Sequence, residues 1–596
     1  MPVGVSRATL RRIVRHSRPY HRPLAGFVLL SIAASLLTVA GPLLAGRVVD
    51  AIVDRSPPRT AMVLAVGIGA AAVLDAVVTL FAAKLSVRIA NGLIFDLRTA
   101  AFARVQRMPV AFFGRIRTGG LVSRLDNDVY DAQHAFSTTL PEAVTNLVTL
   151  AITIAVMVTL SWPITLLTVL LFPLFLFPAR RIGDRLARIY RSVAQANAAM
   201  GAQMTERCTA PGATLVKLFT GPDAESAEFA SRAAQVRDLG VRTAMLRNAF
   251  VTSLTLVSAL AIALVYGVGG WFAARGDVAA GTVVSLSLLL TRLYPPLTGL
   301  AGARVDLVAA LVAFERIFAL LDLEPSITEA SAAAPVPDGA VSVELDAVEF
   351  AYPSAESVVP AALSDITAID TRGGADVLHG VSLRVDPGEM IALVGSSGSG
   401  KSTIAHLIAR LHDVDTGAVR LNGIDVRNLS ARSIRETVGL VSQHCHLFHD
   451  TIRANLLLAR PDATEPDLWN AVARARLRDL IAALPDGLDT MVGDGGHQLS
   501  GGERQRLAIA RVLLQRPRVV ILDEATAALD TASEAAVRDA LTEALADRTA
   551  LVIAHRLTTI RHAHRIVVLE AGRIIEQGTH TELLAANGRY AELCRH

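Results

Sequence analysis

The sequence predicts a multidomain membrane protein. An all-α domain of six spanning helices with long cytosolic helical extensions is followed by an α/β domain. Apolar residues make up 52% of the 596 residues and charged residues only 19%, a composition that is unusual for a soluble enzyme. The long apolar runs lie in the first half of the chain. The second half alternates short β-rich runs with helical patterns, which is typical of a largely parallel sheet covered by helices.

Six apolar stretches are expected to span the membrane, because hydrocarbon obliges a backbone to satisfy its hydrogen bonds internally, as a helix does. The first stretch is uncharged from Leu24 to Gly46, whereas the apolar part of a secretion signal has roughly 7–15 residues. We therefore expect it to be a retained span. The six spans are predicted near residues 24–46, 61–83, 143–160, 164–178, 249–273 and 281–311.

Arginine-rich segments adjoin the spans at the amino terminus and in two long charged intervals, near residues 84–133 and 180–247. The positive-inside rule places all three segments in the cytosol. With six crossings, the second half of the chain is cytosolic as well. We thus expect a multi-pass protein of the inner or plasma membrane with both termini in the cytoplasm. The net charge of +4 is explained by contact with membrane lipid, so no nucleic-acid partner is expected.

Two charged residues, Asp75 and Arg292, fall inside predicted spans. A charge near the middle of the bilayer costs about 2.5–3.5 kcal/mol on insertion scales, so both side chains are expected to face protein or water. The pattern leaves open whether they pair, bind substrate or lie near an interface.

A change of composition separates the two halves of the chain. Residues 322–340 are rich in proline, alanine, serine and acidic residues, as linkers are. The sequence therefore predicts a transmembrane domain at residues 1–321 and a soluble domain at residues 341–596.

A phosphate-binding loop is the strongest motif of the soluble domain. The pattern GxxxxGK[ST] lies between a predicted strand at residues 390–394 and a predicted helix. Backbone N–H groups of such a loop turn toward phosphates, Lys401 reaches the β- and γ-phosphates, and Ser402 is a ligand for Mg²⁺. We predict ATP and Mg²⁺ as cofactors. The residues expected to bind them here are Gly395, Ser396, Ser397, Gly398, Ser399, Gly400, Lys401, Ser402 and Thr403.

Two carboxylates follow the apolar run at residues 519–522. In phosphoryl transfer, the first acid of such a pair holds the magnesium shell and the second polarises the attacking water. Asp523 is therefore the predicted metal ligand and Glu524 the predicted general base of an ATP hydrolase.

The segment LSGGERQR, from Leu499 to Arg506, lies between these two motifs. With it the soluble domain resembles the nucleotide-binding domain of ABC transporters, over residues 341–592. The resemblance implies that Tyr352 stacks on adenine and that Gln443 senses magnesium. It also implies that Asp530 belongs to the D-loop and that His555 contacts the γ-phosphate. The first domain resembles the exporter-type membrane domain, with residues 108–129 and 212–221 as its cytosolic coupling segments.

The signature residues Ser500, Gly501 and Gly502 form an anion site at a predicted helix start, with no phosphate of their own chain within reach. A second half-transporter must bring that phosphate, so ATP is expected to lie between two chains. A homodimer is favoured because Lys401 and Glu524 are present with the signature, and a heterodimer stays open.

The resemblance implies ATP-driven export of a hydrophobic or amphipathic substrate, such as a lipid, a drug or a peptide, by alternating access. Two alternatives remain: an importer with an exporter-like fold, for example for siderophore-type cargo, and a membrane regulator gated by the ATP-binding domains.

Three features depart from the family pattern. Extra residues follow Tyr352, near 357–376, and are interpreted as a surface insertion. Asp494 stands where glutamate is usual. His444, Cys445, His446 and His449 crowd the position after Gln443, although adjacent side chains do not converge on a metal without a special loop.

Overall fold

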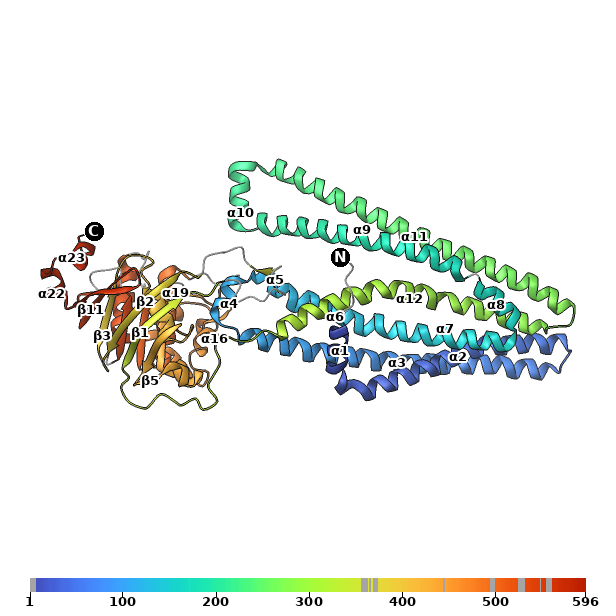
Figure 1. The fold of residues 1–596 in the computed structure, drawn as a ribbon, viewed down its shortest axis with the longest axis horizontal. Coiled ribbons are helices and arrows are strands. Elements are labelled where there is room, and N and C mark those ends of the chain that lie inside the picture. The colour runs from blue at the N-terminus through green and yellow to red at the C-terminus, as the bar shows by residue number, and fades with distance from the viewer. Residues whose placement is uncertain are drawn as a thin grey trace. The chain divides into compact units, whose positions relative to one another are not determined.

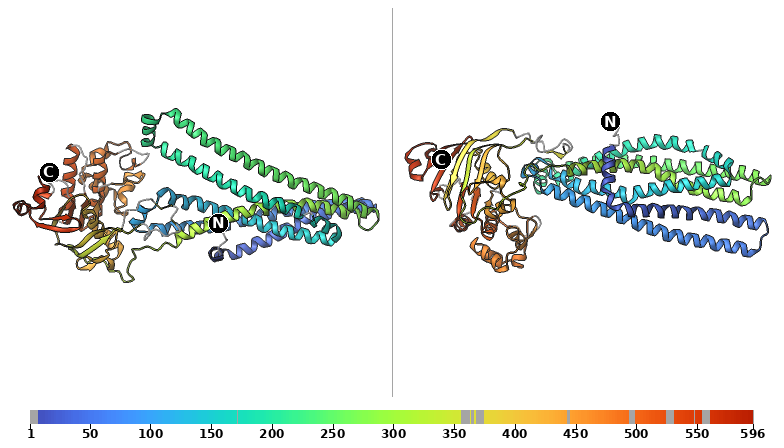
Figure 2. Two further views of the ribbon diagram at one scale, coloured as in Figure 1. Left: turned by 45° about the horizontal axis from the view of Figure 1, so that its top comes forward. Right: turned by 60° about the horizontal axis from the view of Figure 1, so that its bottom comes forward.

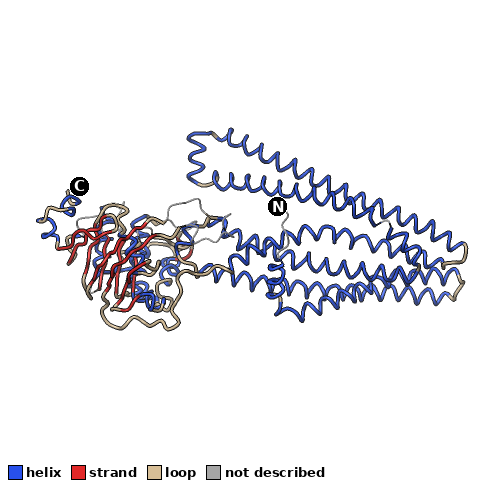
Figure 3. Tube along the Cα trace, viewed as in Figure 1, coloured by secondary structure: helices blue, strands red, loops and turns tan. Residues whose placement is uncertain are grey.

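The computed structural model divides the chain into two compact units. The membrane unit comprises Met1–Arg104 and Val122–Asp322, and the α/β unit comprises Val105–Leu121 and Leu323–His596. Within these units the structure describes residues 7–170, 172–354, 363, 366–367, 374–442, 445–493, 499–523, 531–546, 548–553 and 560–595. Figure 3 separates the units by secondary structure, since the described strands all lie in the α/β unit.

Long helices dominate the membrane unit (Figure 1). Its main helices are α1 (Arg7–His16), α2 (His21–Val53), α3 (Pro58–Gln106), α6 (Val129–His134), α7 (Leu140–Leu160), α8 (Trp162–Leu170), α9 (Phe172–Arg207), α10 (Ala210–Leu215), α11 (Pro222–Ala274) and α12 (Ala280–Leu321). Helix α11 has 53 residues, roughly 80 Å at 1.5 Å per residue, against a hydrocarbon core of about 30 Å. The predicted extensions beyond the membrane are therefore continuations of the spanning helices.

Five helical stretches among the described residues are long and apolar enough to cross a membrane: Arg18–Val53, Pro58–Gln106, Thr118–Leu160, Pro222–Ala274 and Ala280–Leu300. The fourth predicted span, residues 164–178, follows α8 and α9 but includes residue 171, which lies outside the described residues. The six-span topology stays a prediction.

Helices α9 and α11 run side by side as an antiparallel pair that α10 joins at one end (Figures 1 and 2). Helix α12 packs against α2 and α7, around a core of Val39, Met157, Leu286, Leu289 and Leu293.

Small residues bring α2 and α12 into backbone contact. A Cβ placed on Gly46 would lie 1.9 Å from Ser285 Oγ and 2.4 Å from the carbonyl oxygen of Gly281. The Ser285 hydroxyl donates a hydrogen bond of 3.1 Å to the carbonyl of Pro42 on α2. This is the packing expected in lipid, where close van der Waals contact replaces hydrophobic burial as the force between helices.

The α/β unit contains two main sheets. The core sheet has the strand order β12-β11-β3-β10-β9-β6 and is parallel except for the edge strand β12. An antiparallel sheet has the order β2-β1-β4-β5. The strands are β1 (Val343–Ala351), β2 (Asp376–Val385), β3 (Met390–Val394), β4 (Thr416–Leu421), β5 (Ile424–Asp425), β6 (Val438–Val441), β7 (Asp450–Thr451), β8 (Met491–Val492), β9 (Val519–Asp523), β10 (Thr549–Ile553), β11 (Arg565–Glu570) and β12 (Arg573–Gly578).

Helices complete this unit. They are α14 (Lys401–Ile408), α15 (Ala431–Thr437), α16 (Ile452–Leu457), α17 (Glu465–Arg474), α18 (Arg478–Ala482), α19 (Gly501–Gln515), α20 (Thr531–Leu545), α22 (His580–Ala585) and α23 (Arg589–Leu593). Strands β9 and β10 are buried at every position, which explains why their sequences are continuous apolar runs rather than alternating ones. The short helices α4 (Val110–Arg115) and α5 (Thr118–Ser123) follow α3 in the chain, yet residues up to Leu121 group with the α/β unit.

The contact between α2 and α12 can be tested with alanine. Gly46→Ala is expected to lower the thermal midpoint of the detergent-solubilised protein, because overpacking costs about 1–3 kcal/mol and exceeds the gain in helix propensity. Gly69→Ala on α3 is the matched control, since nothing lies within 4 Å of a Cβ at that position. Equal midpoints for the two variants, measured by scanning fluorimetry, would contradict the close packing.

Candidate ATP-binding site

The phosphate loop leaves the core sheet at the end of β3, between β11 and β10. Its backbone requires glycine at two positions at least. Gly400 has φ of 104°, and a Cβ there would lie 2.6 Å from Leu378 Cδ2. A Cβ on Gly395 would lie 2.0 Å from the carbonyl oxygen of Leu569. The loop is therefore packed tightly against β2 and β11, and α14 begins directly after it.

Lys401 is the first residue of α14 and only 6% exposed. Its Nζ donates hydrogen bonds to the carbonyl oxygens of Gly395 (2.9 Å) and Ser396 (2.8 Å). The ammonium group thus lies within the curve of the loop, at the amino-terminal end of a helix whose dipole favours negative charge. The hydroxyl-bearing residue Ser402 follows it and is exposed.

Asp523 lies beside this loop because of the register of the sheet. Ile553 on β10 pairs with Leu393 on β3 and with Asp523 on β9. Asp523 is therefore level with Leu393, two residues before the loop begins, and its side chain is 8% exposed. Burial lowers the pKa of the His406 imidazole on α14, and the negative charge of Asp523 opposes that shift.

Tyr352 lies just beyond the end of β1, in a cluster of rings. Its ring centroid is 5.1 Å from that of Phe350 and 5.3 Å from that of His412, and both pairs are edge-to-face. Its hydroxyl is 3.1 Å from Thr403 Oγ1, on the helix that follows the phosphate loop. The structure thus brings together Tyr352 and the loop, which are separated by about forty residues in sequence.

A cavity of about 490 Å³ lies beside Tyr352. Its other lining residues include Val377, His406 and His412 from the α/β core and Ala111 and Arg115 from α4. Burial lowers the pKa of both histidines, so neutral imidazoles face the cavity at pH 7. A purine base fits such a lining of aromatic and neutral polar groups. Sequence analysis missed both histidines, although His406 lies one helical turn after Thr403.

The signature segment forms the start of α19. The hydroxyl of Ser500 accepts a hydrogen bond from the N–H of Glu503, and the Glu503 carboxylate accepts one from the N–H of Ser500. This capping box fixes the first turn of the helix. Ser500 and Gly501 are exposed, so N–H groups and the Ser500 hydroxyl proton remain accessible at a helix start.

Several predicted site residues lie outside the described residues: Gln443, Glu524, Asp530 and His555. Asp494, which departs from the family pattern, lies outside them as well. Their roles stay predictions.

The remaining candidate residues, among those that the structure describes, do not lie together in one site. Asp75 is half-buried on α3, where its Oδ1 has no hydrogen-bond partner among the described residues, and Arg292 is exposed on α12. No ion pair joins these two side chains. Burial raises the pKa of the Cys445 thiol, which disfavours the reactive thiolate. Within the described ranges, no three histidine, cysteine or acidic side chains are grouped as metal ligands would be.

Comparisons with known proteins match both halves of the chain. The model of the ABC transporter transmembrane region matches residues 24–297, and the ABC transporter model matches residues 378–527. A protein of Bacillus subtilis named as a candidate multidrug export ATP-binding/permease protein is 32% identical over 98% of each chain. An ATP-dependent lipid A-core flippase of Chromobacterium violaceum is 36% identical over 84% of this chain and 82% of its own. A bacterial Atm1-family ABC exporter solved with ATP bound matches with a TM-score of 0.76 and 28% identity, over 97% of this chain and 98% of that one.

The fold and the loop define an ATP-driven membrane transporter, and the chain belongs to the ABC transporter family. It is of the exporter type, with one helical transmembrane region and one ATP-hydrolysing domain in a single chain. The chain is therefore a half-transporter, and this architecture implies a dimer.

Tyr352 offers the most direct test of where the base lies. Tyr352→Ala is expected to weaken ATP binding about fivefold or more, because stacking of a base on an aromatic ring contributes about 1–3 kcal/mol. Tyr352→Phe keeps the ring and removes only the hydroxyl near Thr403, so it should bind ATP almost as the wild type does. Equilibrium titration of the two purified variants compares them. Equal affinity in Tyr352→Ala and wild type would remove Tyr352 from the site.

Proposed function

We propose that the protein exports an amphipathic molecule bearing an anionic group, and that ATP bound between two copies of the chain drives the export. The anionic group of the cargo is inferred from a cavity of about 570 Å³ along α9 and α11 of the membrane unit. It is lined by Val193, Gly240, Thr243, Ala244, Arg247, Asn248 and Val251.

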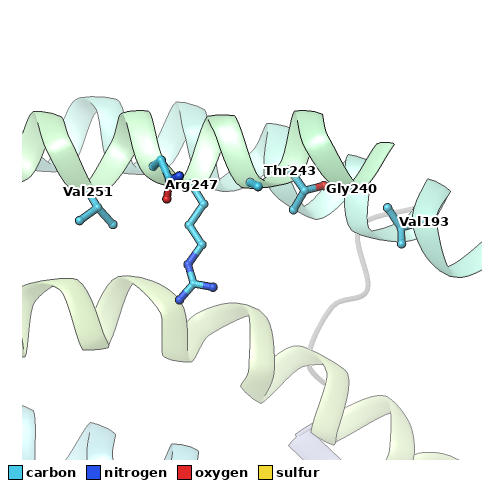
Figure 4. A pocket seen from close by; sticks show the side chains of 7 residues that line it. Val193, Gly240, Thr243, Arg247 and Val251 are labelled. Atoms are coloured by element: carbon cyan, nitrogen blue, oxygen red, sulfur yellow. The ribbon is translucent and has the colours of Figure 1, made fainter. Parts of the chain in front are cut away.

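Arg247 supplies the charge of this cavity. Figure 4 shows its side chain extending from α11 toward α12, away from the α9–α11 pair. Arg247 is exposed and has no ion pair among the described residues, so its guanidinium is available to a ligand. It lies two residues before the predicted fifth span, at the boundary where an amphipathic molecule places its polar group. A guanidinium binds carboxylate or phosphate in two-point fashion, which suits an anionic head group.

The relatives support a cargo of this kind. Lipid A-core is the stated cargo of the Chromobacterium violaceum protein, and multidrug export is the stated role of the Bacillus subtilis protein. Membrane lipid would then be both the surroundings and a source of cargo. Because the relatives are exporters, import of siderophore-type cargo is the second candidate direction.

The proposed hydrolysis uses residues at the carboxyl ends of β3 and β9 in the core sheet. Buried Asp523 and the exposed hydroxyl of Ser402 offer hard oxygen ligands beside the phosphate loop, a donor set that fits Mg²⁺. When bound, Mg²⁺ neutralises charge on the β- and γ-phosphates. Lys401 binds the same phosphates, and Glu524 takes the proton of the attacking water. Gln443 senses the magnesium, and His555 contacts the γ-phosphate.

The partner is proposed to be a second copy of this chain. The signature helix offers free N–H groups, and the phosphate loop of a second copy would bring ATP to them. Apolar side chains also project at the cytosolic hairpin between α9 and α11, within the second predicted coupling segment. Phe219 there is 80% exposed and Leu218 is 68% exposed. Large apolar groups exposed in this way mark interaction surfaces.

The proposed location is the inner or plasma membrane, with both termini in the cytoplasm. The support is the arginine-rich character of the amino terminus and of the two long cytosolic intervals.

The cargo is tested by ATPase stimulation in proteoliposomes, using alkyl phosphates, alkyl glucosides and alkyl ammonium salts of one chain length. Alkyl phosphates are expected to stimulate most strongly. Arg247→Gln should raise their half-maximal concentration about tenfold, because a hydrogen bond to a charged group contributes about 1.5–3 kcal/mol. Arg242→Gln is the control, since Arg242 is exposed on the same helix but does not line the cavity. Equal effects of both substitutions, or equal stimulation by all three amphiphiles, would contradict the anionic cargo.

The homodimer is tested by expressing this chain alone and weighing it in lipid nanodiscs by native mass spectrometry. The expected protein mass is twice the 63.1 kDa of one chain, with measurable ATPase activity. A monomer without activity that gains both properties only with a different half-transporter would overturn this part of the proposal.

A further inference from the structure

The inserted residues after Tyr352 contact residues 105–121 of the same chain, the part of the first predicted cytosolic segment that groups with the α/β unit. These residues are called the first cytosolic segment below. Among the described members of the insertion are Leu363, Ile366 and Thr367, and the first two are 0% and 8% exposed. Thr367 forms an antiparallel bridge with Ile116, and the N–H of Arg117 donates a hydrogen bond of 2.9 Å to the carbonyl of Ile366. All of these residues belong to the α/β unit.

The side chain of Ile366 packs against a glycine that leaves room for it. A Cβ on Gly120 would lie 2.7 Å from Ile366 Cγ2 and 2.8 Å from its Cβ. The neighbouring Gly119 has nothing within 4 Å of a Cβ. Because Ile116 and Leu121 are also buried, the contact is apolar and closely packed rather than a chance approach of two loops.

The same insertion is anchored at Tyr352. The N–H of Gly374, at its far end, donates a hydrogen bond of 2.9 Å to the carbonyl of Tyr352. The Nη2 of Arg115 on α4 donates one of 3.3 Å to the carbonyl of Pro353. The first cytosolic segment is therefore held at two points after the tyrosine, through Arg115 at Pro353 and through Arg117 at Ile366.

We propose that Ile366 is a positioning residue that links occupancy of the Tyr352 cavity to the first cytosolic segment. This inference rests on the proposed binding of adenine at Tyr352. Residues 105–121 are covalently continuous at both ends with the membrane unit, so a segment held by the insertion passes a shift at Tyr352 directly to the spanning helices of its own chain. The insertion thereby couples the Tyr352 cavity to the spanning helices within one chain. The signature helix, in contrast, would act between two chains.

Hydrogen exchange tests this link, because the N–H of Arg117 is bonded to Ile366 and reports their contact. The full-length Glu524→Gln protein is compared with and without ATP, following peptides that cover residues 112–121. ATP is expected to change the exchange of the Arg117 amide. Gly120→Ala and Ile366→Ala should each reduce that change about fivefold while leaving the Kd for ATP within about twofold. Gly119→Ala is the matched control and should behave as the parent does.

The double variant distinguishes a specific contact from general damage. If Gly120 and Ile366 act through each other, Gly120→Ala with Ile366→Ala should be no worse than either single variant. Equal behaviour of Gly120→Ala and Gly119→Ala, or an Arg117 amide that ATP leaves unchanged in the parent, would overturn the role of Ile366. A parent whose ATP affinity is insensitive to Tyr352→Ala would instead refute the proposed adenine site, and the Kd measured in the same samples tells the two failures apart.

Discussion

The attraction between a nucleotide's phosphates and preorganised N–H groups is the interaction on which the rest of the structure depends. The α/β unit presents N–H groups at two helix starts, α14 after the phosphate loop and α19 after Ser500. The first includes Lys401, held within the loop by two carbonyl oxygens. A triphosphate joined to both helix starts would draw two copies together. Its hydrolysis would break the bond between the β- and γ-phosphates, so that one molecule would no longer join the two helix starts. In this scheme, binding energy at the phosphates is the source of movement for the membrane helices.

The membrane unit is suited to following such movement because its helices pack tightly in one place and border a cavity in another. Helices α2 and α12 approach closely enough for Gly46 and Gly281 to touch through their backbones, which favours motion as one body. The cavity along α9 and α11 contains the exposed Arg247. In the proposed mechanism, the tightly packed helices α2 and α12 move together. Arg247 holds the cargo in the cavity until the cargo is released.

Much of the fold could be predicted because its signals are local. Apolar length predicts spanning helices, and the strand at residues 390–394 coincides with β3. The phosphate loop was predictable for a similar reason, because Gly400, Lys401 and Ser402 are consecutive and their chemistry depends on backbone geometry within one turn.

The rest depends on tertiary contacts that spacing does not encode. His406 on α14 and His412 after it line the same cavity as Tyr352, and neither belongs to a motif. The contact of Ile366 with Gly120 connects residues about 250 positions apart. Likewise, Val105–Leu121 lie between two predicted spans in the sequence. Their grouping with the α/β unit could therefore not be predicted from their position.

The most direct test of the central claim places two defects on the same copy or on different copies of a dimer. In the Glu524→Gln background, differently tagged chains are co-purified and the ATP retained per dimer after gel filtration is counted. If each ATP lies between Lys401 of one chain and Ser500 of the other, a dimer with Lys401→Ala on one copy and Ser500→Arg on the other retains one ATP. A dimer with both substitutions on a single copy and a Glu524→Gln partner retains none. The reverse result, one ATP in the second dimer and none in the first, would show that each chain builds its site alone and would contradict the account.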